Sequence, residues 1–199
     1  MITRRAATGI VLAGGRSSRF GSDKLAVQLD GRPLLHHAIE AVGLVCAEVL
    51  VVVGPDGAPD LPHIPGTDLR LVRDPEPLGG PLVGLGAGLA AASYSVALAV
   101  GGDMPRLEAA VLVLMLDAVG SAEAAILDVA GGRLQTLPMA LRVEPARTAH
   151  ERIREAGGRS LRQLLDELDL SRIPVATWRA LDAPGSTIID IDRPSDLPS

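Results

Sequence analysis

The chain has 199 residues and a net charge of −5 at pH 7, and 47% of its residues are hydrophobic. That length and apolar content suffice for one domain with a sizeable core, whereas the negative charge argues against nucleic-acid binding, which depends on clustered Lys and Arg. There are three aromatic residues, one each of Phe, Tyr and Trp, so a stacking platform for bases is not expected. No apolar run reaches the roughly 18 residues of a membrane span.

The cysteine content narrows the redox chemistry and the compartment. Cys46 is the single cysteine, which excludes an internal disulfide and a multi-cysteine metal site. Its apolar neighbours predict a small buried side chain. We therefore expect a cytoplasmic protein with neither a membrane nor a nucleic acid as its partner.

The first two thirds of the chain alternate apolar strands with helical patterns. In chain order we expect a strand at 8–13, a helix at 33–42, strands at 48–53 and 69–73, a glycine-rich turn opening a helix of small residues, a strand at 95–100, a helix at 107–119 and a strand at 124–127. Strands that are apolar throughout are typical of a sheet covered on both faces. The pattern predicts an α/β fold: a Rossmann-like, three-layer domain with a mostly parallel central sheet.

The pattern becomes less regular after Gly131. A proline interrupts LQTLPMALR at 134–142, and helices are expected near 144–156 and at 160–168. Strand-like stretches at 172–177 and 187–191 follow. Because no repeat or linker separates this part from the rest, we treat residues 1–199 as a single domain.

The stretch GIVLAGGRSSRFGSDK, residues 9–24, follows the first expected strand with glycines, hydroxyls and cations. Such a loop brings backbone N–H groups and positive charge to anionic oxygens, which in an acidic protein indicates a polyphosphate site. It matches neither the Walker A pattern nor the dinucleotide fingerprint. Lys24 is the only lysine, and asparagine is absent, as expected of a GC-rich coding sequence. A lysine that persists in such a composition indicates a role that arginine cannot fill.

Two further stretches place carboxylates beside expected strand ends. Asp103 follows the buried strand at 95–100 and precedes Met104-Pro105, a suitable position for a Mg²⁺ ligand or a helix cap. Asp190 and Asp192 alternate along the strand expected at 187–191, so their side chains should share one face.

Several motifs together resemble one family of nucleotidyltransferases. The first loop, L-x-G-G-x-x-x-R-F-G-x-x-K, is similar to the signature loop of many of these enzymes. RDPEPLGGPLVGLGAGL at 73–89, GGDMPRL at 101–107 and IIDIDRPSDL at 188–197 resemble blocks of molybdenum cofactor guanylyltransferases, in the same order. The resemblance implies the nucleotide-diphospho-sugar transferase fold and transfer of GMP from GTP to molybdenum-molybdopterin. Molybdoenzymes or cofactor chaperones would then be downstream partners.

The resemblance also implies roles for individual residues. The backbone of Leu12, Ala13, Gly14 and Gly15 would cradle the nucleotide, Lys24 and Arg19 would act on the phosphates, Asp74 would read the guanine edge, and Asp103 with Asp192 would hold Mg²⁺. Nucleotidyl transfer suits such a set, because both reactants are anionic and catalysis rests on positioning and positive charge.

Other activities stay open at this point. A family asparagine that contacts the base falls near Gly54-Pro55 and has no match, and Asp190 and Asp192 stand where the family has two asparagines. A cytidylyltransferase or another nucleotidyltransferase of the same fold is the nearest alternative. An inactive nucleotide-binding regulator is a second, although Lys24 and Asp103 are both present. A nicotinamide-dependent dehydrogenase is disfavoured by the glycine spacing.

Overall fold

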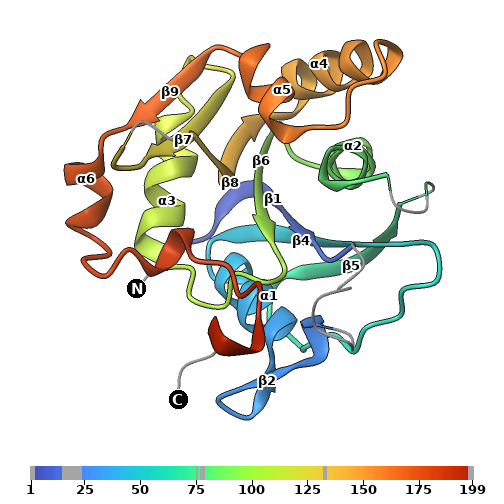
Figure 1. Ribbon diagram of the computed structural model, residues 1–199, viewed down its shortest axis with the longest axis vertical. Coiled ribbons are helices and arrows are strands. Elements are labelled where there is room, and N and C mark those ends of the chain that lie inside the picture. Colours follow the sequence, from blue (N-terminus) through green and yellow to red (C-terminus); the bar gives the residue numbers. More distant parts are fainter. Residues whose placement is uncertain (1–2, 15–23, 75, 77–78, 132–133, 197–199) are drawn as a thin grey trace.

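The computed structural model describes residues 3–14, 24–74, 76, 79–131 and 134–196. A seven-stranded sheet in the order β5-β4-β1-β6-β8-β7-β9 forms its centre (Figure 1). The strands are β1 (Arg5–Leu12), β4 (Cys46–Val53), β5 (Asp68–Arg73), β6 (Val96–Gly101), β7 (Ala124–Asp128), β8 (Leu134–Arg142) and β9 (Leu170–Ile173). β8 is antiparallel to both of its neighbours, and the other six strands run in one direction. The predicted α/β architecture with a mostly parallel sheet is confirmed.

Helices cover both faces of this sheet, which gives the three layers (Figure 1). On one face lie α1 (Leu34–Gly43), α3 (Ala109–Ala118) and α6 (Val175–Arg179), and on the other α2 (Pro81–Ala91), α4 (Val143–Glu155) and α5 (Leu161–Asp166). Successive strand residues alternate between the two cores: Val51 packs toward α1 while Val52 packs toward α2. This alternation explains why the central strands β4 and β6 are apolar at nearly every position. No helix among the described residues is long and apolar enough to cross a membrane.

Short elements complete the structure near the end of the first loop. The 3₁₀ helix η1 (Lys24–Ala26) leads into a hairpin of β2 (Gln28–Leu29) and β3 (Arg32–Pro33). Two more 3₁₀ turns, η2 (Ser186–Ile188) and η3 (Pro194–Asp196), belong to the C-terminal segment, which we define as residues 182–196. In Figure 1 this segment lies beside α1 and the hairpin.

A buried carboxylate ties the sheet together at the end opposite the strand carboxyl termini. Glu48 of β4 accepts hydrogen bonds from the Thr8 hydroxyl, from the Ser93 N–H and hydroxyl, and from Arg70 of β5. Its side chain is 2% exposed. Burial alone would raise the pKa of Glu48, but these donors outweigh that effect and lower the pKa to about 2. Glu48 is therefore a structural anion.

Three expectations for the second half need correction or refinement. Residues 134–142, expected to be an irregular stretch, form β8. Pro138 lies beside the register shift between Ile126 and Asp128, where the regular pairing of the two strands is interrupted and its missing N–H costs no hydrogen bond of the ladder. The strand expected at 172–177 ends at Ile173, because Pro174 has a backbone suited to a helix start and opens α6. The strand expected at 187–191 is absent from the described residues, where η2 covers 186–188 instead.

Candidate active site

The carboxyl ends of the central parallel strands meet at one edge of the sheet. The Gly102 N–H donates to the Leu12 carbonyl oxygen at 2.9 Å, and the Ala13 N–H donates to that of Val52 at 2.7 Å. These bonds extend the sheet beyond β1 and set the direction in which the chain leaves it. Leu12, Ala13 and Gly14 thus lie where an open α/β sheet binds its ligands. Gly15 and Arg19, two further candidates, lie outside the described residues.

Lys24 enters this edge from η1, and its side chain is only 10% exposed. Its Nζ donates to Asp103 Oδ2 at 2.9 Å and to Asp192 Oδ1 at 3.0 Å. Burial of the ammonium would lower its pKa, but the two carboxylates outweigh that cost and hold the pKa of Lys24 above its ordinary value. Lys24 is therefore a permanently charged cation between two segments distant in sequence.

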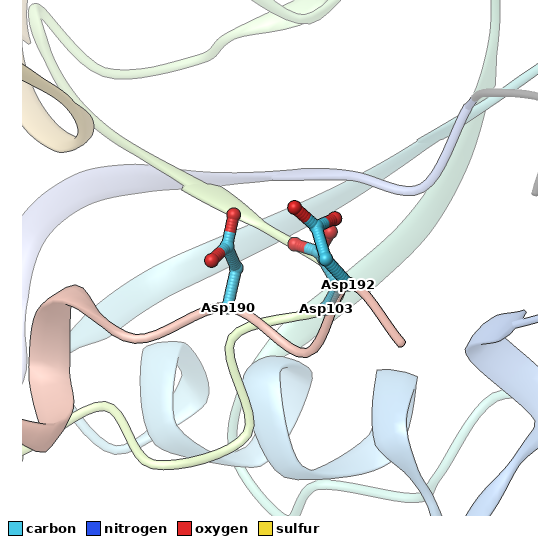
Figure 2. A group of neighbouring side chains, drawn as sticks. All are labelled: Asp103, Asp190 and Asp192. Atoms are coloured by element: carbon cyan, nitrogen blue, oxygen red, sulfur yellow. The ribbon is translucent and has the colours of Figure 1, made fainter. Parts of the chain in front are cut away.

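The carboxylates of Asp103, Asp190 and Asp192 form one group (Figure 2). Each offers an oxygen within 4.8 Å of the others. Partial burial and the like charges of Asp192 and Asp103 raise the pKa of Asp190. The expected pair of ligands, Asp103 and Asp192, is thus accompanied by a third carboxylate.

Backbone hydrogen bonds bring the C-terminal segment to Asp103. The buried Asp182 carboxylate accepts the N–H groups of Gly185 and Thr187 at 3.1 and 2.8 Å, which closes the turn before η2. The Thr187 hydroxyl then accepts the N–H of Glu108 at the start of α3. These bonds engage the Thr187 N–H within the segment and fix the Thr187 side chain to the start of α3, where η2 forms in place of the expected strand.

The shared face expected for Asp190 and Asp192 nevertheless exists. Ile191, between them, is buried against Leu29 and Leu34, and its N–H donates to the Asp103 carbonyl oxygen at 2.9 Å. With Ile191 turned inward, the side chains of Asp190 and Asp192 extend from the same side of the segment, beside Asp103 (Figure 2). Asp190 and Asp192 therefore share a face, as predicted, although the strand expected to align them does not form.

Asp196 completes this arrangement from the C-terminal side. Its Oδ2 accepts the N–H groups of Asp192 and Arg193 at 3.0 and 2.7 Å. Neither Asp182 nor Asp196 was a candidate in the sequence: Asp182 lies outside every motif, and the block at 188–197 gives no sign that Asp196 binds the backbone. Both act on the backbone that carries the carboxylate group.

Asp74 lies at the end of β5, separate from the carboxylate group. Its N–H donates to the Val53 carbonyl oxygen at 2.8 Å, and its side chain is buried, with Oδ1 accepting the Glu76 N–H at 2.9 Å. Its Oδ2 lies 3.8 Å from where a Cβ on Gly84 would stand. A methyl group at position 84 would thus stand in ordinary van der Waals contact with the carboxylate.

The donor set at this edge has a definite chemical character. Three carboxylates supply only hard oxygen ligands, the kind that Mg²⁺ and Mn²⁺ take in proteins. One lysine supplies a compact charge for phosphate oxygens. The residues present therefore fit a divalent cation and a polyphosphate side by side.

Similarity to known proteins extends over most of the chain. The MobA-like NTP transferase domain matches residues 9–172. A probable molybdenum cofactor guanylyltransferase of Chloroflexus aggregans is 34% identical, covering 96% of this chain and 91% of that protein. A molybdenum cofactor guanylyltransferase of Xanthomonas euvesicatoria is 36% identical, covering 88% and 86%.

Solved structures show the same fold at lower identity. Molybdopterin-guanine dinucleotide biosynthesis protein A of Archaeoglobus fulgidus has a TM-score of 0.73 at 20% identity, covering 95% of this chain and 94% of its own. A Mycobacterium tuberculosis protein crystallised in complex with manganese has a TM-score of 0.62 at 19% identity, covering 86% and 89%. The family domain matches most of the chain, and the two relatives are more than 30% identical to it over most of their length. This chain therefore belongs to the MobA-like NTP transferases, within the family of molybdenum cofactor guanylyltransferases.

Proposed function

We propose that this chain transfers GMP from GTP to the terminal phosphate of molybdenum-loaded molybdopterin and releases pyrophosphate. An acceptor phosphate oxygen forms the new bond to the α-phosphorus, and the bond from that phosphorus to the oxygen bridging to the β-phosphate breaks. The observation that carries the proposal is the convergence of Lys24, Asp103 and Asp192 at the sheet edge of a chain in this family.

The main demand on the protein is to gather positive charge, because nucleophile, target and leaving group are all anionic. Lys24, held on the two aspartates, would turn its ammonium to the triphosphate, and Arg19 would clamp non-bridging oxygens. The backbone at 12–15 would hold the nucleotide at the end of β1.

Asp103, Asp190 and Asp192 would hold a Mg²⁺ ion, which neutralises charge on the phosphoryl oxygens and on departing pyrophosphate when bound. The three carboxylates supply the ligand type, and the manganese complex of the structurally similar M. tuberculosis protein is consistent with divalent-metal use in this fold. We place the reaction in the cytoplasm, where a reduced thiol such as that of Cys46 persists.

Base selection would rest on Asp74. A buried carboxylate that accepts from the N1–H and N2–H of guanine would distinguish this base from cytosine, which lacks that pair of donors.

A nucleotide panel tests the proposal. Purified protein is supplied with Mg²⁺, molybdenum-molybdopterin and GTP, CTP or ATP, and pyrophosphate release is measured. We expect release with GTP and much less with the others, and loss of release in Asp103→Asn. A preference for CTP would contradict the guanine assignment, whereas turnover that is indifferent to Asp103→Asn would remove the carboxylate group from the mechanism.

A further inference from the structure

The turn that carries Asp74 is held by a contact outside the site already described. Asp74 Oδ1 is engaged by the N–H of Glu76, so the direction of the carboxylate depends on where the Glu76 backbone lies. The Glu76 side chain points away to α4, where Arg154 Nη2 donates to both of its oxygens, at 2.7 and 2.8 Å. Arg154 is thus two contacts from Asp74, although it lies 78 positions from Glu76 in the sequence.

The helix that supplies Arg154 is itself closely packed against α2. One turn before Arg154, His150 lies over Gly86, where a Cβ would stand 2.3 Å from the imidazole ring. Since any larger residue at Gly86 would push the helices apart, this glycine permits the close approach. Arg154 is also 23% exposed, less than other paired arginines of α4. The Arg154 guanidinium is therefore carried by a helix that is closely packed against α2.

Glu76 is the charged partner of Arg154. Within the part of the chain that the structure describes, the second guanidinium nitrogen, Nη1, donates to the Gly158 carbonyl oxygen at 3.5 Å. A charge-assisted bond to both carboxylate oxygens is stronger and more directional than a neutral one. Loss of Arg154 would leave the Glu76 side chain without this restraint, and the backbone that donates to Asp74 would gain freedom.

We infer that Arg154 is a positioning residue for base selection, which through Glu76 orients the Asp74 carboxylate toward the exocyclic amino group of a guanine nucleotide. This inference rests on the proposed function, in which Asp74 reads guanine. It extends base selection to α4, an element without any residue at the carboxylate group. The substrate class that Arg154 serves is a purine nucleotide with a 2-amino group, as distinct from one without.

The test compares GTP with ITP, which keeps N1–H but lacks the 2-amino group. Affinities are measured by titration calorimetry with Mg²⁺ and without the acceptor, so that no turnover occurs. Arg154→Met removes the charge and keeps most of the chain length. The matched control is Arg152→Met on the same helix, which breaks the exposed pair with Glu167 instead.

We expect Arg154→Met to lower the ratio of GTP to ITP affinity about fivefold, the scale of one hydrogen bond. ITP affinity and melting temperature should hardly change. Arg152→Met should leave the ratio as in the wild type, and Arg154→Lys should restore part of it, because a lysine still pairs with Glu76. Glu76→Gln should act like Arg154→Met, and the double variant should be no worse than either single one.

Three outcomes overturn the inference in distinguishable ways. If Asp74→Asn lowers the ratio but Arg154→Met does not, Asp74 reads the base without help from α4, and only this inference fails. If Asp74→Asn leaves the ratio unchanged, the guanine-reading role in the proposed function fails as well. A fall in GTP and ITP affinity by the same factor would show a general loss of structure instead of a loss of positioning.

Discussion

Replacing Lys24 with methionine should make the carboxylate group bind divalent cations more tightly while it impairs the reaction. Lys24 Nζ lies 2.9 Å from Asp103 Oδ2 and 3.0 Å from Asp192 Oδ1, and those two aspartates are also proposed metal ligands. An ammonium and a divalent ion therefore compete for the same oxygens and repel each other. Methionine keeps the length of the side chain and removes the charge.

The size of the effect follows from the closer pair. At 2.9 Å and an effective dielectric constant of about 20, the attraction between Lys24 and Asp103 is roughly 6 kcal/mol before any desolvation cost. Lys24 is 10% exposed and Asp103 29%, so solvent and relaxation cancel much of it. If about a quarter survives as competition with the metal, removing the ammonium tightens metal binding about tenfold.

Manganese is a suitable probe, since free Mn²⁺ is quantified by electron paramagnetic resonance. In the absence of nucleotide we expect Lys24→Met to lower the dissociation constant about tenfold, and Lys24→Arg, which keeps the charge, to change it little. Turnover with GTP should fall in both variants. Equal or weaker Mn²⁺ binding by Lys24→Met would refute the competition.

Three further predictions concern stability and the support of the site. Gly88→Ala should lower the free energy of unfolding by about 2 kcal/mol, because its Cβ would stand 2.6 Å from the buried side chain of Ile10. Gly84→Ala should be nearly neutral, because its Cβ would stand 3.6 Å from the nearest atom. Urea unfolding measures both variants, and equal stabilities would contradict this difference. Wild-type protein should lose about 3 kcal/mol of stability as the pH falls from 5 to 2, since the folded-state pKa of Glu48 is lowered to about 2 and protonation then favours the unfolded chain; Glu48→Gln should show a flatter profile in acid titration, and an identical slope would contradict the assignment. Asp196→Ala should reduce turnover about tenfold by freeing the backbone of Asp192, with a melting temperature within about 3 °C of the wild type; unchanged kinetics would show that this backbone needs no such support.

The layers of the fold were predictable because each strand carries its own signal. Runs such as residues 48–53 alternate between two apolar cores, and that environment leaves almost no polar position in the sequence. β8 escaped prediction because Pro138 resembles a chain break when its register irregularity is unknown. The C-terminal segment escaped prediction because the Asp182 carboxylate accepts the Thr187 N–H and the Thr187 hydroxyl accepts an N–H at the start of α3, which no local pattern reveals.

The site was predictable to the extent that strand ends determine it. Lys24 and Asp103 follow β1 and β6, neighbours in the sheet, so their proximity follows from topology. Asp190 joined them as a third carboxylate, which the alternation around Ile191 allowed but did not require. The contact of Glu76 with Arg154 depends on how α4 packs against the rest of the domain, and the spacing of these two residues in the sequence does not predict it.

The reach of the carboxylate group along the chain has a consequence for synthesis. Lys24 and Asp192 are 168 positions apart, and two of the three grouped aspartates lie in the C-terminal segment. Synthesis runs from Lys24 toward Asp190 and Asp192, so the carboxylate group cannot assemble until the C-terminal segment has been made, however well the earlier strands have paired. The same order makes activity a sensitive reporter of complete folding, and a cut ahead of Asp190 should silence the enzyme while most of the sheet survives.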